Sequence, residues 1–243
     1  MSPEPERIVH RDAATLAEVT AGRLAVALVD AIALRGRASV GLTGGGVGID
    51  LLRRLARSPL RAAVDWSRVD VWWGDERFLP AGDPERNERQ ARDALLDAVA
   101  VEPALVHAMG GSGEFDSPED AAQAYAEEMA AGVAAAGPWD VLLLGMGPEG
   151  HTGSVFPESP AAHETERWVV GVRGCPKPPP LRVTLTLPAM NRARQVWVVA
   201  AGADKAPAVA EVFAGAGPLQ LPVAGVRGGE RTLWLLDLAA DGR

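Results

Sequence analysis

The stretch that decides the fold is Trp139–Pro157, which reads WDVLLLGMGPEGHTGSVFP. It begins with a continuous apolar run, Val141 to Leu144, a pattern typical of a strand buried on both faces of a parallel sheet. Three of the next six residues are glycines, which let the backbone approach a ligand closely. His151 follows directly. Because ligands of open parallel sheets bind at the carboxyl ends of strands, the stretch predicts an active site at His151. A tight turn with an incidental histidine is the alternative.

Apolar runs and amphipathic segments alternate on either side of this stretch. We expect strands at 8–9, 38–42, 69–73, 106–109, 141–144, 168–172, 182–187, 196–200, 223–226 and 232–236, and helices at 13–33, 47–57, 88–99, 118–136 and 203–214. The alternation predicts an α/β fold: a mostly parallel sheet with helices on both faces, a Rossmann-like three-layer sandwich. No repeat or linker divides the chain, so we expect one domain spanning residues 1–243.

The composition of the chain argues against several classes of protein. The chain has 243 residues, 47% of them hydrophobic, which is enough for a sizeable core. Its net charge of −8 argues against a nucleic-acid partner, so an anionic ligand would need local cations. The single cysteine, Cys175, excludes an internal disulfide. There is no signal-peptide pattern, and no apolar run approaches the roughly 18 residues of a membrane span. We expect a cytoplasmic protein with no membrane partner, and the residue usage is typical of a GC-rich bacterial genome.

Small residues separate the second predicted strand from its helix. Thr43, Gly44, Gly45 and Gly46 place backbone N–H groups at a helix N-terminus, where the partial positive charge favours a phosphate. The pattern is not a dinucleotide fingerprint, since Ile49 stands where a third glycine is needed, and it lacks the Lys-Ser/Thr ending of a P-loop. A glycine-rich helix entry that only eases packing is the alternative.

Charged residues follow the strand at 69–73, in WGDERFLP. Asp75, Glu76 and Arg77 stand at its carboxyl end, and arginine offers a planar fork that matches phosphate or carboxylate oxygens. A structural ion pair of Arg77 with a neighbouring acid is the alternative. Asn87, further along the loop, either caps the next helix or helps to close the site.

Two further cations stand beside predicted strands. Lys205 lies in the first turn of a predicted helix, where a cation opposes the helix dipole unless an anion sits between them. Solvent exposure explains Lys205 equally well. Arg182 opens a strand next to the rigid loop GCPKPPP, so it either lines the same cleft or pairs with an acid. Arg173 and Lys177 are weaker candidates.

Other catalytic constellations are not supported. No H-x-x-x-H or clustered His/Cys spacing indicates a metal site, and no G-x-S-x-G elbow indicates a serine nucleophile. We interpret Ser154 as a loop or helix-cap serine. His10, His107 and His163 have no glycine loop beside them, and we expect them to be structural or surface residues.

Taken together, the motifs resemble the 6-phosphogluconolactonase family of the glucosamine/galactosamine-6-phosphate isomerase superfamily. The matching blocks run in family order from about Ser39 to Lys205: GLTGGGVGIDLL, WWGDERFLP, RNERQARDALL, LLLGMGPEGHTGSVFP, RVTLTLPAMNRA and AAGADKAPAV. Many members have Asp at the position of Glu149 and Ser at that of Thr43, and both exchanges keep the chemical function. The resemblance implies hydrolysis of 6-phospho-D-glucono-1,5-lactone to 6-phosphogluconate, with no cofactor and no metal.

The residues suit that chemistry. Our hypothesis is that His151 acts as general base on a water that attacks the lactone carbonyl, while Glu149 orients the imidazole. Loop N–H groups or a nearby arginine would stabilise the oxyanion, and His151 would return the proton to the leaving ring oxygen. Asp75 would hold substrate hydroxyls or fix Arg77. The candidates for substrate and phosphate binding are Thr43, Gly44, Gly45, Gly46, Arg77, Arg182 and Lys205.

Two alternatives remain open. A sugar-phosphate isomerase or deaminase would use the same glycine–histidine loop, but the deaminases carry an acid soon after the histidine, where this chain has Ser154 to Pro157. A non-catalytic sugar-phosphate-binding regulator could dispense with His151 and would usually add a DNA-binding segment. No coiled coil or apolar stripe indicates self-association, so we expect a monomer.

Overall fold

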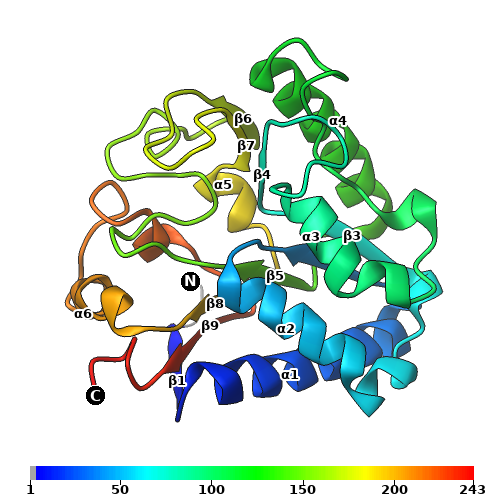
Figure 1. The fold of residues 1–243 in the computed structure, drawn as a ribbon, viewed down its shortest axis with the longest axis horizontal. Coiled ribbons are helices and arrows are strands. Elements are labelled where there is room, and N and C mark those ends of the chain that lie inside the picture. Colours follow the sequence, from blue (N-terminus) through cyan, green and yellow to red (C-terminus); the bar gives the residue numbers. More distant parts are fainter. Residues whose placement is uncertain (1–3) are drawn as a thin grey trace.

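The main sheet has six strands, all parallel, in the order β1-β9-β8-β5-β2-β3 (Figure 1). A computed structural model describes residues 4–243, with the side chains of all of these except 134–136. The strands are β1 (Glu6–His10), β2 (Ala38–Leu42), β3 (Val69–Trp73), β5 (Val141–Leu144), β8 (Gln195–Ala200) and β9 (Arg231–Asp237). The predicted α/β class is confirmed.

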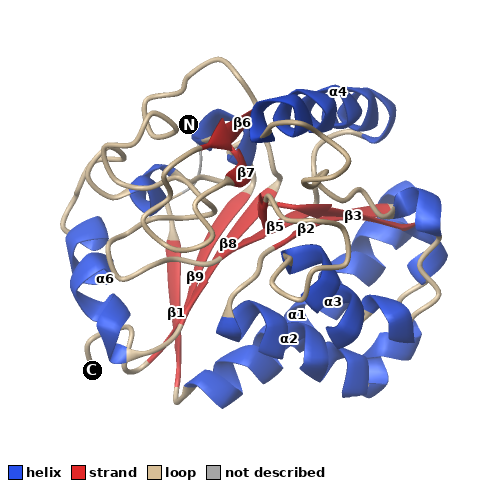
Figure 2. Ribbon diagram, turned by 45° about the horizontal axis from the view of Figure 1, so that its top comes forward, coloured by secondary structure: helices blue, strands red, loops and turns tan. Residues whose placement is uncertain are grey.

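Helices cover both faces of this sheet (Figure 2). On one face lie α1 (Ala13–Arg35), α2 (Gly46–Arg57) and α3 (Asn87–Ala94). On the other lie α4 (Pro118–Ala136), α5 (Leu187–Met190), α6 (Ala206–Phe213) and a small antiparallel sheet in the order β4-β7-β6. Its strands are β4 (Asp75–Arg77), β6 (Val169–Val172) and β7 (Arg182–Leu185). None of the helices in residues 4–243 is both long and apolar enough to cross a membrane.

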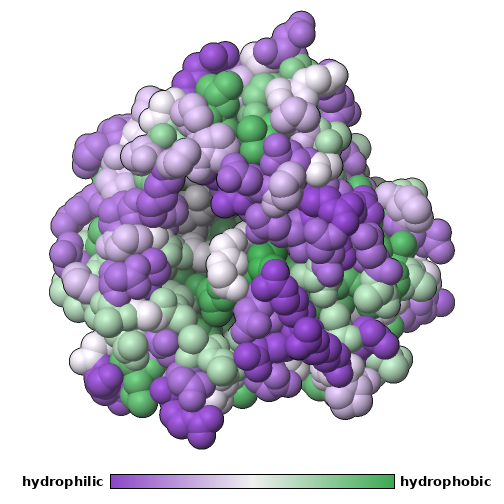
Figure 3. Space-filling view, viewed as in Figure 1, coloured by the Kyte–Doolittle hydropathy of each residue, from purple (hydrophilic) through white to green (hydrophobic). Residues whose placement is uncertain are grey.

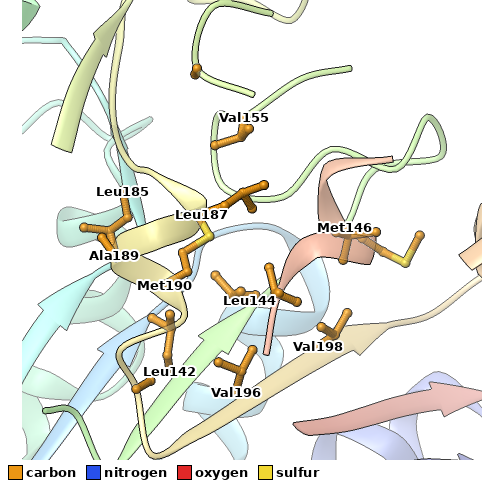
Figure 4. Close-up of a cluster of buried hydrophobic side chains, with 14 of the residues drawn as sticks. Leu142, Leu144, Met146, Val155, Leu185, Leu187, Ala189, Met190, Val196 and Val198 are labelled. Carbon is orange, nitrogen blue, oxygen red and sulfur yellow. The ribbon is translucent and has the colours of Figure 1, made fainter. Parts of the chain in front are cut away.

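The central strand β5 shows why its apolar run is continuous. Val141 and Leu143 belong to the core cluster under α1 and α2, whereas Leu142 and Leu144 belong to the cluster on the opposite face. Figure 4 shows Leu142 and Leu144 beside side chains of β8 and α5. Because successive side chains of a strand point to opposite faces, a strand covered on both sides needs apolar residues at every position.

Two predicted helix starts are confirmed by their caps. The Asp12 carboxylate accepts a hydrogen bond of 2.7 Å from the N–H of Thr15 at the start of α1. Ser117 Oγ accepts one of 3.1 Å from the N–H of Asp120 at the start of α4. Each bond satisfies an N–H group that has no partner within the helix.

Several predicted segments are wrong in detail. The strand expected at 106–109 is a single isolated β-bridge between Val106 and Val71. The strand expected at 223–226 is a short 3₁₀ helix, Pro222–Gly225. This helix begins with a proline, which has no N–H to donate to a neighbouring strand. β7 ends at Leu185, because Thr186 caps α5. The helix expected from 88 ends at Ala94, and that expected from 203 begins as a 3₁₀ turn, Ala203–Lys205. β4 was not predicted.

Candidate active site

A cavity opens at the carboxyl ends of the central strands, over the start of α2. It has two adjoining lobes of about 320 and 480 Å³, and both are lined by Gly44, Gly45, Gly145, Met146, His151 and Lys177. The space-filling view in Figure 3 shows the surface hollowed near the middle of this face. Parallel-sheet proteins bind ligands at this edge.

The structure brings the predicted site residues together. The first lobe is lined by Thr43, Gly44, Gly45, Asp75, Arg77, His151 and Arg182. The second lobe is lined by Gly44, Gly45, Gly46, His151 and Lys205. Glu149 lines neither lobe but contacts His151, which lines both.

The loop after β5 is shaped to hold His151. The Gly147 N–H donates to the His151 carbonyl at 3.0 Å, and the Gly150 N–H donates to the Gly147 carbonyl at 3.0 Å. Gly150 has φ of 80°, a conformation that glycine adopts without strain. A Cβ added at Gly147 would lie 2.0 Å from His151 Nδ1, so the imidazole folds back over a backbone position that admits no side chain.

The environment of His151 suits a neutral base. Its ring stacks on Phe156 with centroids 4.4 Å apart, and Nδ1 lies 3.2 Å from Glu149 Oε1. Burial lowers the pKa of His151 and Lys177 lowers it further, against the opposing charge of Glu149. Burial tends to raise the pKa of Glu149, but hydrogen bonds to its own N–H and to Lys177 outweigh this and lower it. When the neutral imidazole carries its proton on Nδ1, the ionised Glu149 accepts a hydrogen bond from that N–H, and Nε2 is the basic nitrogen.

Lys177 lies closer to Glu149 and His151 than its sequence position indicates. Its Nζ lies 3.0 Å from Glu149 Oε1 and 3.5 Å from His151 Nδ1. The sequence marked Lys177 only as a weak candidate, because nothing in the proline-rich loop shows which way the loop turns. The one available signal was a lysine fixed in a rigid segment beside the strand that Arg182 opens.

Asp75 is held by two side chains that the sequence did not assign to it. Ser154 Oγ donates to Asp75 Oδ2 at 2.7 Å, and Asn87 Nδ2 donates to Asp75 Oδ1 at 3.3 Å and to the Asp75 carbonyl at 2.8 Å. No ion pair joins Asp75 to Arg77 among the described residues. Ser154 is therefore part of the site rather than only a loop serine, and Asp75 is oriented independently of Arg77.

Glu76 anchors the neighbouring helix. Its carboxylate accepts the N–H groups of Arg77, Asn87 and Glu88 at 2.7, 2.7 and 2.8 Å, so it caps the start of α3. Burial raises the pKa of Glu76 to about 7, against the opposing charge of Arg86. The capping role considered for Asn87 thus belongs to Glu76, and the Asn87 amide is directed to Asp75 instead.

The predicted cations lie in different parts of the cavity. Arg77 lines the first lobe and donates from Nη1 to the Glu85 carbonyl at 2.5 Å. Lys205 lines the second lobe, with Nζ 2.8 Å from Asp204. That lobe also contains the N-terminus of α2, where Gly45 at the N-cap position provides no side-chain cap. The first N–H groups of α2 are therefore open to an anion.

Other polar groups lie outside the cavity. His107 stacks on Trp72 and contacts Asp70 and Glu128, which makes it a structural histidine. The His163 ring contacts the Ser159 carbonyl at 3.0 Å. Within residues 4–243, no three His, Cys, Asp or Glu side chains gather as a metal site would require.

Comparisons with known proteins identify the family. A family model described as Glucosamine-6-phosphate isomerases/6-phosphogluconolactonase matches residues 11–234. The 6-phosphogluconolactonase of Streptomyces coelicolor is 58% identical over 247 residues, covering 99% of this chain and 95% of the relative. That of Mycobacterium tuberculosis is 49% identical and covers 94% of each chain. The solved structure of 6-phosphogluconolactonase from Trypanosoma cruzi has a TM-score of 0.85 at 25% identity, covering 100% of this chain and 98% of that one.

These matches confirm the resemblance that the motifs indicated. They extend over nearly the whole chain, the fold is shared with solved members, and the glycine–histidine loop and the charged strand ends surround one cavity. The chain belongs to the 6-phosphogluconolactonase family, the lactone hydrolases of the glucosamine-6-phosphate isomerase superfamily.

Proposed function

We propose that this chain hydrolyses 6-phospho-D-glucono-1,5-lactone to 6-phosphogluconate, the second step of the oxidative pentose phosphate pathway, with His151 as general base. The observation that carries the proposal is the imidazole between the two lobes, held at Nδ1 by Glu149 3.2 Å away. The relatives named 6-phosphogluconolactonase support this choice of substrate.

The proposed reaction uses His151 twice. Neutral His151 takes a proton from water as the water oxygen bonds to the lactone carbonyl carbon, and the carbonyl electrons move to oxygen. Arg77 and loop N–H groups are the candidates for stabilising that oxyanion. When the carbonyl reforms, the bond from carbon to the ring oxygen breaks and His151 returns its proton to that oxygen. Glu149 stabilises the imidazolium between the two transfers.

The two lobes suggest how the substrate is oriented. We place the phosphate in the second lobe, on Lys205 and the N–H groups of the loop from Thr43 to Gly46, because a helix N-terminus and an ammonium converge there. Arg77 and Arg182 line the first lobe, where the lactone ring would lie. Asp75 would accept hydrogen bonds from ring hydroxyls, since Ser154 and Asn87 already fix its carboxylate.

The test is the hydrolysis of freshly generated lactone, coupled to 6-phosphogluconate dehydrogenase. The lactone opens without an enzyme, so the spontaneous rate must be subtracted. Acceleration above that rate supports the proposal. No acceleration, combined with turnover of glucosamine-6-phosphate or a pentose phosphate, would assign the chain to the deaminase or isomerase branch. Tight sugar-phosphate binding without any turnover would favour a binding protein.

A further inference from the structure

Arg182 makes contacts that differ from those of a ligand-binding arginine. It opens β7 and is only 5% exposed. Its Nε donates to the Pro179 carbonyl at 2.8 Å, and its Nη2 donates to the Pro178 and Lys177 carbonyls at 2.9 and 3.2 Å. No carboxylate pairs with it in the part of the chain that the structure describes. The alternative of an acid pair is therefore wrong for Arg182.

The proline-rich loop that Arg182 contacts has few backbone N–H groups with which to form its own hydrogen bonds. Three consecutive prolines, 178 to 180, have no N–H to donate. The loop closes through a single backbone bond of 3.0 Å, from the Cys175 N–H to the Pro180 carbonyl. The guanidinium fork supplies three further bonds, to three successive carbonyls. The path of the backbone at Lys177 therefore depends on Arg182.

The position of Lys177 matters because of what its ammonium contacts. Nζ lies 3.0 and 3.2 Å from the two Glu149 oxygens and 3.5 Å from His151 Nδ1. The side chain is 45% exposed, so the ammonium would move toward water if its backbone were released. Such a movement would remove a positive charge from beside the imidazole. The Glu149 carboxylate would then interact with His151 without the competing ammonium.

We propose that Arg182 is a positioning residue that acts on the Glu149–His151 pair through the loop carrying Lys177. The effect of Arg182 on catalysis rests on the proposed function. The effect of Arg182 on the pKa of His151 does not, because that pKa can be measured in the unliganded protein.

The charges around His151 determine whether its pKa rises or falls when Lys177 is displaced. Glu149 on its own loop and Asp75 on β4 favour the protonated imidazole, and Lys177 opposes it. Arg77, Arg182 and Lys205 line the same cavity. Arg182→Lys keeps the charge but removes the planar fork, so it should release the loop without changing the net charge. With Lys177 displaced, the pKa of His151 should rise, because the nearby positive charge that disfavours the imidazolium is removed.

The experiment is an NMR titration of the histidine Cε1–H signals. The chain has four histidines, and His151→Gln assigns the relevant signal. Arg182→Lys and Lys177→Met should each raise the His151 pKa, and the double variant should rise no further than Lys177→Met alone. Arg173→Lys is the matched control, because Arg173 is an exposed arginine that pairs with Glu119 on α4, and its replacement should leave the titration unchanged. If Arg182→Lys does not fold, Arg182→Gln replaces it; because that variant also removes a positive charge, the inference then rests on the double variant, whose shift should still be no larger than that of Lys177→Met alone.

Four results separate the possibilities. An unchanged His151 pKa in a folded Arg182 variant would overturn the inference, as would shifts of the two single variants that add. A raised KM with an unshifted pH profile would show that Arg182 binds ligand directly, which also overturns it. Wild-type protein that fails to accelerate lactone hydrolysis would remove the proposed function, while the titration would still decide the role of Arg182.

Discussion

Replacing Gly147 with alanine displaces the proposed base without deleting any functional group. The new Cβ would lie 2.0 Å from His151 Nδ1, 2.1 Å from Cε1 and 2.4 Å from Glu149 Oε2. Carbon contacts are optimal at about 3.5 Å, so the ring must retreat by on the order of 1 Å or rotate. Glu149 must move as well, and the hydrogen bond that orients the imidazole would be lost.

The expected loss is mainly in kcat. A misplacement of about 1 Å can lower a rate roughly 100-fold, which corresponds to about 2.7 kcal/mol of transition-state stabilisation. Stability should fall by no more than about 2–3 kcal/mol, because overpacking of about 1–3 kcal/mol is partly offset by the loss of glycine freedom in the unfolded chain, worth about 0.4–1 kcal/mol. The coupled lactone assay measures kcat, and a thermal melt measures the change in Tm.

Gly145→Ala is the matched control in the same loop. A Cβ at Gly145 would lie 3.7 Å from Thr43 Oγ1, an ordinary contact, so His151 should stay in place and kcat should remain within a few-fold of wild type. The reasoning would be refuted if Gly147→Ala kept the wild-type kcat in a folded protein, or if both alanine variants lost activity equally.

Three further outcomes are expected. Lys205→Ala should weaken the binding of 6-phosphogluconate at least about ten-fold, the loss expected for a charge-assisted hydrogen bond, and should leave the binding of gluconate unchanged. Calorimetry measures both affinities. Equal affinity of the wild type for the two ligands would mean that there is no phosphate site. The acid limb of kcat/KM should have its midpoint below pH 6.5, the ordinary pKa of histidine, because burial and Lys177 lower the pKa of His151; a midpoint above pH 6.5 would contradict this. Burial opposes a raised pKa of His107, but hydrogen bonds to Asp70 and Glu128 raise it, so protonated His107 stabilises the fold below about pH 6.5 and the free energy of unfolding should fall as the pH rises through the raised value. Urea melts of wild type and His107→Gln across that range test this, since only the wild type should show that component of the fall.

Most of the sheet could be predicted from the sequence because a strand buried on both faces appears there as a run of apolar residues. β2, β3 and β5 have their predicted bounds, since each is a mostly apolar run that is followed directly by glycine or threonine. β4 is not such a run. Its three residues are charged, and it exists through pairing with β7 more than 100 residues later, a contact that local pattern cannot show. The segment at 223–226 has the composition of a strand, but Pro222 begins a 3₁₀ helix there.

The site was predictable where function follows a strand end, and not where it depends on loop conformation. His151, Asp75 and the loop from Thr43 to Gly46 all follow buried strands, so parallel pairing brings them to one edge. The partner of Ser154 lies 79 residues away, and the acceptors of Arg182 are backbone carbonyls, which every residue has. Sequence patterns carry no signal for either contact.

The central claim is that His151 is the base in hydrolysis of 6-phosphogluconolactone. The most direct measurement is the rate of opening of freshly generated lactone by wild type and by His151→Ala, each compared with the spontaneous rate. We expect clear acceleration by the wild type and near-spontaneous opening with His151→Ala, whose melting temperature and affinity for 6-phosphogluconate should stay close to wild type. Lactone hydrolysis by His151→Ala at a rate near that of the wild type would contradict the account.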